Sequence, residues 1–124
     1  MNREKLREGF FHVFKAAGYS LAGLRTGLRL SLAFRQEAAI LAVLIVMLAA
    51  FGKPFTTWLA ALGAWFLVMA AELLNTALEE TLNLITRDYN IAVKHAKDMA
   101  SAAVFLMLAL NAGLWFAIFV LNCF

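Results

Sequence analysis

Three kinds of residue are scarce in this sequence. It has one cysteine and one proline, and charged residues make up 15% of its 124 positions. Because Cys123 has no second cysteine to pair with, an intramolecular disulfide is excluded. The first twenty residues are charged and amphipathic, without a short apolar core and a small-residue cleavage site, so we expect no cleavable signal peptide.

The motifs of common nucleotide-binding and hydrolytic sites are also absent. The sequence contains no GxxxxGK[ST], no GxGxxG and no protein-kinase catalytic loop. Histidine and cysteine do not occur at zinc-binding spacing, and no Ser–His–Asp arrangement is indicated. Any nucleotide chemistry therefore requires an unconventional site, and we expect no nucleic-acid partner.

Apolar residues are what the sequence has in excess. They make up 64% of it, against about 45–50% in soluble domains. A soluble domain of this length has too little interior to bury them, so we expect an all-α integral membrane protein. We place a single membrane domain over 1–124, with crossings at 32–52, 54–85 and 97–122. Lys53 and Pro54 mark the turn between the first two crossings.

Residues 1–30 have a different character from the crossings. Their apolar residues recur at helical spacing with cations on other faces, which predicts an amphipathic helix lying in the membrane surface. We expect the segment AAGYS (16–20) to interrupt this helix, since Gly18 weakens it. Lys and Arg gather before the first crossing and between the second and third. The positive-inside rule therefore places the N-terminus in the cytoplasm and the C-terminus in the periplasm.

One polar stripe interrupts the second crossing. It consists of Glu72, Asn75, Glu79 and Asn83, whose spacing places all four within roughly 80° of arc on a helix. An ionised carboxylate at the bilayer centre costs about 2.5–3.5 kcal/mol. Polar residues of this kind sometimes serve only as hydrogen bonds between helices or as a solvated helix end. Four on one face indicate a functional site.

The loop after the stripe supplies further polar side chains at the cytoplasmic end. Carboxylates suit a divalent metal, and a lysine neutralises phosphate charge, so this loop predicts binding of a metal–phosphate group. The residues are Asp88, Tyr89, Asn90, Lys94, His95, Lys97 and Asp98.

Four stretches of the sequence are distinctive. They are FKAAGYSLAGLR (14–25), AFRQE (33–37), AELLNTALEE (71–80) and AKDMASAAV (96–104). Together they resemble the bacterial integral-membrane diacylglycerol kinase family, and the likeness covers nearly the whole chain. The resemblance implies a homotrimer of the bacterial inner membrane with active sites shared between subunits. Such an enzyme transfers the γ-phosphate of MgATP to the primary hydroxyl of diacylglycerol, forming phosphatidate.

The resemblance also implies roles for the residues that match the family's motifs. Glu72 would be the general base on the lipid hydroxyl, Asn75 would orient groups beside it, and Glu79 would be a ligand of Mg²⁺. ATP would contact His12, Tyr19, Glu79, Asp88, Tyr89, Asn90, Lys97 and Asp98. The lipid would border Ala16, Ala17, Gly18, Tyr19, Ser20, Leu21, Arg25, Thr26, Gly27, Leu28, Ala33, Phe34, Arg35, Gln36, Glu37, Glu72 and Ser101.

Two positions depart from the family's pattern. Ser31 stands where the family usually has a second metal-binding glutamate, which predicts weaker binding of Mg²⁺, with Glu80 as a nearby candidate for compensation. His12 stands where the family often has an arginine, and a mostly neutral histidine predicts a weaker phosphate contact. Three alternatives stay open: an undecaprenol kinase, which differs in its lipid pocket, a catalytically weak membrane binding protein of the same fold, and a structural subunit.

Overall fold

The computed structural model describes residues 3–124, which form four α-helices. These are α1 (Arg3–Leu30), α2 (Leu32–Ala50), α3 (Phe55–Ile85) and α4 (Ile91–Phe119). Residues 1 and 2, which belong to the expected surface helix, lie outside the described residues. The expected all-α fold is confirmed, and α2, α3 and α4 are each long and apolar enough to cross a membrane.

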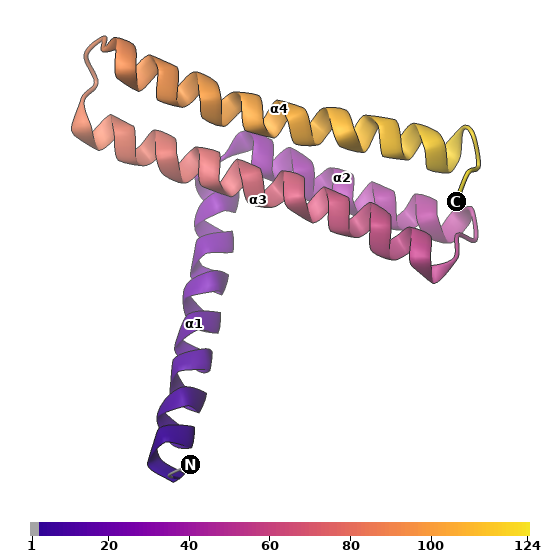
Figure 1. Ribbon diagram of the computed structural model, residues 1–124, viewed down its shortest axis with the longest axis horizontal. Helices are drawn as coiled ribbons and strands as arrows, with labels where there is room; N and C mark the ends of the chain where they lie inside the picture. The colour runs from indigo at the N-terminus through magenta and orange to yellow at the C-terminus, as the bar shows by residue number, and fades with distance from the viewer. Residues whose placement is uncertain (1–2) are drawn as a thin grey trace.

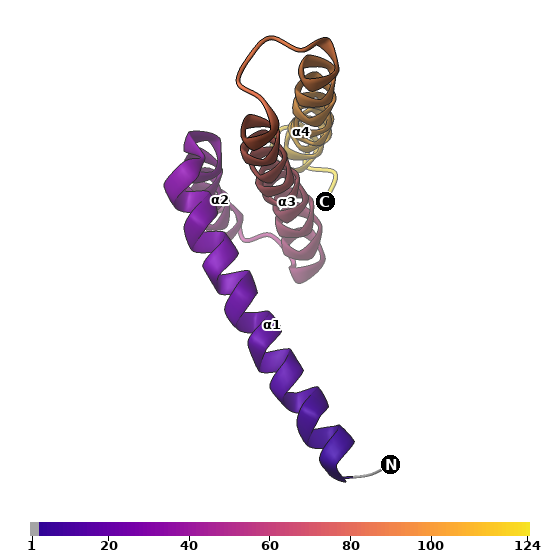
Figure 2. The same ribbon diagram turned by 90° about the vertical axis from the view of Figure 1, so that its left-hand side faces the viewer.

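The three apolar helices form one bundle. α3 lies between α2 and α4 and packs against both, as Figure 2 shows along the bundle. α1 runs crosswise from the start of α2, and α3 and α4 extend past the point where α1 and α2 join (Figure 1). The projecting parts are the end of α3 and the beginning of α4, where the polar stripe and the following loop lie.

Local sequence signals set the ends of the helices. The Ser31 side chain caps α2 by accepting a hydrogen bond from the Phe34 N–H at 3.0 Å. Asn90 caps α4 in the same way, accepting from Ala92 N and Val93 N. Gly52 turns the chain between α2 and α3 with a φ of 60°, a conformation that glycine adopts without strain. These caps satisfy N–H groups that a helix start otherwise leaves without partners.

The core of the bundle lies away from the polar stripe. Six buried side chains form it: Leu44, Leu48, Ala61, Trp65, Val68 and Ile118. The ring of one of these six residues, Trp65, lies 5.0 Å from the ring of Trp115, measured between centroids. At the end of the bundle that holds the α2–α3 turn, the Lys53 ammonium donates to the Ile118 carbonyl at 2.8 Å, which connects this turn to α4. The core therefore fixes the three helices and leaves their other ends free to carry the site.

α1 is one unbroken helix, so the interruption expected at residues 16–20 is wrong. A single glycine costs a helix about 1 kcal/mol relative to alanine, which is too little to break a 28-residue helix that continues on both sides of it. Only Gly27 of α1 is buried. A methyl group there would press on Leu73 of α3 and Phe34 of α2, so the missing side chain permits the close approach of α1 to the bundle.

Candidate active site

The polar stripe lies on the side of α3 that faces other helices. Glu72 is buried, with 6% of its surface exposed, whereas Asn75, Glu79 and Asn83 are half-buried. Both ends of the stripe receive hydrogen bonds from other parts of the bundle, at Glu72 from the start of α2 and at Asn83 from α4. Glu80, the neighbour of Glu79, is exposed.

Two hydroxyl groups hold the Glu72 carboxylate. Ser31 Oγ donates to Glu72 Oε1 at 2.8 Å across the helices. Thr76 Oγ1, one turn further along α3, donates to the same oxygen at 3.3 Å. Hydrogen bonds to an ionised acceptor are stronger than those between neutral groups, and they favour a fixed orientation of the carboxylate. Within residues 3–124, one ion pair is present, between Lys94 and Asp98. Glu72 therefore has hydroxyl partners there and no cationic partner.

A second carboxylate is buried near the first. Glu37 of α2 has only 5% of its surface exposed, although the sequence places it among the residues bordering the lipid. The backbone carbonyl of Glu37 accepts a hydrogen bond from Trp65 Nε1 at 3.0 Å, which fixes the position of Glu37 along α3. Its Oε2 has no hydrogen-bond partner in residues 3–124. A buried carboxylate oxygen of this kind is costly unless a ligand or ion completes it.

Oxygen donors at the middle of the stripe suit a hard cation. Asn75 Oδ1 is buried and has no hydrogen-bond partner among residues 3–124, and Glu79 lies one turn further along α3. Mg²⁺ prefers carboxylate and amide oxygens and is often held by one or two protein ligands plus substrate phosphates and water. In the described chain, no three His, Cys, Asp or Glu side chains gather into a metal cluster. The residues fit Mg²⁺ bound together with phosphate and do not fit an all-protein metal centre.

The beginning of α4 brings two cations to the projecting end of the bundle. Lys97 Nζ donates to Asn83 Oδ1 at 2.9 Å, which joins α4 to the polar stripe. Lys94 pairs with Asp98 at 2.6 Å, and both side chains are largely exposed. A small open hollow of about 340 Å³ adjoins them. Its lining residues are Asp88, Tyr89, Asn90, Val93, Lys94, Lys97 and Asp98. All of the predicted loop residues except His95 thus line one hollow.

The two predicted nucleotide contacts on α1 make no hydrogen bond to Glu72 within residues 3–124. Tyr19 is 71% exposed, and His12 is also exposed, on the part of α1 that runs away from the bundle (Figure 1). Nearer the joint, an open groove of about 700 Å³ runs between α1 and α3. It is lined by Ser20, Gly23, Leu24, Thr26, Gly27, Leu30, Leu73, Thr76, Ala77 and Glu80. Predicted lipid-border residues therefore line this groove together with Thr76, the partner of Glu72.

The lipid-border residues of α2 lie near the α1–α2 joint. Arg35 Nη1 donates to the carbonyls of Leu28 and Arg29, which turns its guanidinium back onto the end of α1. Phe34 is buried, whereas Gln36 is exposed. Ser101 is exposed on α4.

Two contacts of Glu72 were missed by the sequence reasoning. Ser31 was considered only as a lost metal ligand, although a serine just before an apolar helix is an N-cap signal that fixes its position. Thr76 lies four residues after Glu72, within reach on a helix, and that spacing was a usable signal.

Comparison with known proteins gives one consistent result. The sequence profile of prokaryotic diacylglycerol kinase matches residues 18–119. The chain is 35% identical to the diacylglycerol kinase of Escherichia coli (strain K12) over 107 residues, which cover 86% of this chain and 88% of that protein. It is 32% identical to the diacylglycerol kinase of Haemophilus influenzae over 107 residues, or 86% and 91% of the two chains. With that of Helicobacter pylori (strain J99) the identity is 35% over 109 residues, or 87% and 84%.

Proposed function

The chain belongs to the prokaryotic diacylglycerol kinase family, and from this premise we propose that it transfers the γ-phosphate of ATP to the primary hydroxyl of diacylglycerol, giving phosphatidate. One observation carries the proposal. Glu72 lies on a helix that is able to cross a membrane, and its buried carboxylate accepts hydrogen bonds from two hydroxyl groups. Next to it lie oxygen donors that suit Mg²⁺, and a lysine follows at the end of the stripe. This combination supports phosphoryl transfer to a lipid alcohol.

The reaction needs little covalent chemistry from the protein. Glu72 accepts the proton of the lipid hydroxyl while the oxygen of that hydroxyl bonds to the γ-phosphorus of ATP. The bond between the γ-phosphorus and the oxygen that bridges it to the β-phosphate breaks, and ADP leaves. Lys97, which donates to Asn83 at the end of the stripe, would neutralise phosphate charge with its ammonium group. Asn75 and Glu79 would hold Mg²⁺, which when bound neutralises charge on the phosphates. Positioning and charge neutralisation therefore account for most of the catalysis.

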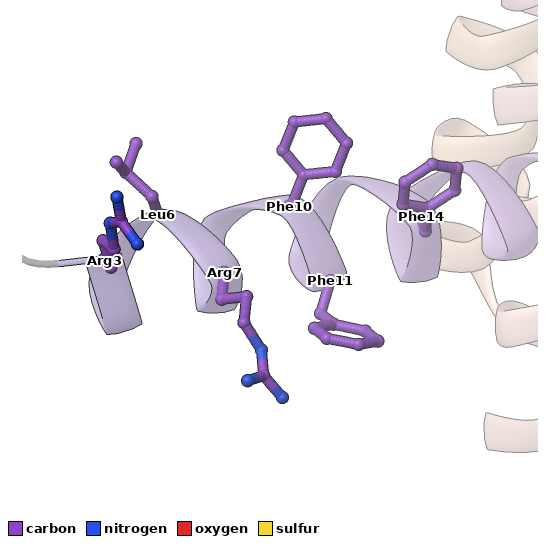
Figure 3. Close-up of a pocket in the computed structure, with 6 residues that line it drawn as sticks. All are labelled: Arg3, Leu6, Arg7, Phe10, Phe11 and Phe14. Atoms are coloured by element: carbon purple, nitrogen blue, oxygen red, sulfur yellow. The ribbon is translucent and has the colours of Figure 1, made fainter.

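α1 supports a location at the membrane surface. Figure 3 shows Leu6, Phe10 and Phe14 along one side of α1, with Arg7 and Phe11 on another. All four apolar side chains are exposed, as expected for a helix that buries them in the headgroup region. With α1 in the cytoplasmic surface of the bacterial inner membrane, the α1–α2 joint and Glu72 lie at the depth where a lipid hydroxyl meets a soluble nucleotide.

A homotrimer completes this proposal. Tyr19 and His12 are exposed and make no hydrogen bond to Glu72 within residues 3–124, so they would contact nucleotide at a site shared with a neighbouring subunit. On the outside of the bundle, long apolar side chains of α3 and α4, such as Phe66 and Phe105, are exposed and available to lipid or to another subunit.

The function is tested with purified protein in mixed micelles, supplied with MgATP and either diacylglycerol or undecaprenol. We expect phosphate to appear in phosphatidate. A clear preference for undecaprenol would retain the chemistry and reject the assigned lipid. If neither lipid were phosphorylated by folded protein, the proposed activity would be wrong.

A further inference from the structure

The Ser31 hydroxyl makes two hydrogen bonds, one as acceptor and one as donor. Its hydroxyl oxygen accepts from the Phe34 N–H at 3.0 Å and its hydroxyl donates to Glu72 Oε1 at 2.8 Å. A carboxylate has no proton to give, so with Glu72 ionised the proton between them belongs to Ser31. The side chain is buried, with 7% exposed, and it lies between α1 and α2. The backbone at the start of α2 thereby determines where the hydroxyl points.

The two oxygens of Glu72 have different surroundings. Oε1 accepts from both Ser31 and Thr76, at 2.8 and 3.3 Å. Among residues 3–124, both hydrogen bonds that Glu72 accepts go to Oε1, and none is made to Oε2. A carboxylate anchored through one oxygen has little freedom to rotate, so its other oxygen keeps a fixed direction.

We propose that Ser31 is a positioning residue, which anchors Glu72 by Oε1 so that Oε2 receives the proton of the lipid hydroxyl. This inference rests on the proposed function and gives Ser31 a role different from that of the glutamate it replaces. In this arrangement the Ser31 hydroxyl gives its proton to Glu72 and accepts a hydrogen bond from Phe34 N, so the two contacts that it makes in residues 3–124 are those of a positioning group. Preorganisation of this kind acts on the chemical step more than on substrate binding.

Three substitutions separate this role from helix capping. Ser31→Gly removes the hydroxyl and leaves a residue that an N-cap tolerates well. Ser31→Thr keeps the hydroxyl and the cap. Ser31→Cys keeps the shape and supplies only a weak donor. Each variant is purified in micelles beside the wild type, and its melting temperature and elution volume are compared before kcat and the KM values for MgATP and diacylglycerol are measured.

We expect kcat to fall by roughly tenfold or more in Ser31→Gly, by less in Ser31→Cys, and to remain within about threefold of wild type in Ser31→Thr. Both KM values should stay within about twofold, because the anchor acts on the base and not on either substrate. A merely structural serine would change melting temperature without this division between kcat and KM.

The failures are distinguishable. If the wild type is active and Ser31→Gly keeps its kcat, or changes only a KM, the inference is wrong and the kinase function stands. If Ser31→Gly does not fold, Ser31→Cys decides in the same way. Wild-type protein that phosphorylates no lipid would overturn the function and the inference together.

Discussion

At the scale of single residues, the site keeps carboxylates buried without cationic partners among residues 3–124. Glu72 is bound by two hydroxyls, and Glu37 and Asn75 each have an oxygen with no donor within residues 3–124. Such groups cost free energy in a low-dielectric setting unless charge arrives from outside. In the proposed function a metal–nucleotide complex would supply that charge, and the substrate would complete the site.

Glu79 is the residue whose loss tests the metal assignment. We expect Glu79→Gln to lower kcat by about 10²-fold and to raise the Mg²⁺ concentration needed for half-maximal rate, because one anionic ligand is lost. Initial rates measured over a series of free Mg²⁺ concentrations check this.

Glu80→Gln is the matched control, since it removes the same charge from the exposed neighbouring position. Its Mg²⁺ dependence should equal that of the wild type. An unchanged Mg²⁺ dependence in Glu79→Gln would show that the ligand assignment is wrong, and a shift in Glu80→Gln instead would assign the compensating role to Glu80.

At the scale of helices, the packing of α1 on the bundle depends on one glycine. We expect Gly27→Ala to lower the free energy of unfolding by roughly 1–3 kcal/mol relative to Gly23→Ala, because the new methyl group presses on Leu73 and Phe34. Gly23 has no atom within 4 Å of the place its Cβ would occupy, so its substitution adds only helix propensity. Denaturant unfolding of both variants in micelles measures the difference, and equal stabilities would contradict this packing.

The sequence was sufficient for the helices and insufficient for their contacts. Apolar runs and helical spacing placed the polar stripe on α3, because periodicity depends only on local geometry. The hydrogen bond of Ser31 to Glu72 and the burial of Glu37 depend on how α2 is seated against α3. No pattern within one segment encodes that seating. The prediction that residues 16–20 interrupt α1 is wrong because the cost of one glycine is small against the many helical residues on both sides of it.

At the scale of the whole molecule, a site shared between subunits predicts rescue by mixing. We expect Glu72→Gln and Tyr19→Ala each to be nearly inactive alone. The two variants are unfolded together and reassembled as mixed trimers. If Glu72 and Tyr19 act in one site from different subunits, about a quarter of the sites in random mixtures contain both native residues. We therefore expect about a quarter of wild-type activity to return. Activity no greater than the average of the two separate variants would place both residues in one subunit's site.

The central claim is that the buried carboxylate of Glu72 performs proton transfer in lipid phosphorylation. The most direct measurement compares phosphate transfer from MgATP to diacylglycerol by wild type and Glu72→Gln, after both have been shown to elute and melt alike. Glutamine keeps the size and the acceptor oxygen and removes the base. The account predicts an active wild type and a loss of about 10²–10⁴-fold in kcat for the variant. A Glu72→Gln protein that turns over at the wild-type rate would contradict it.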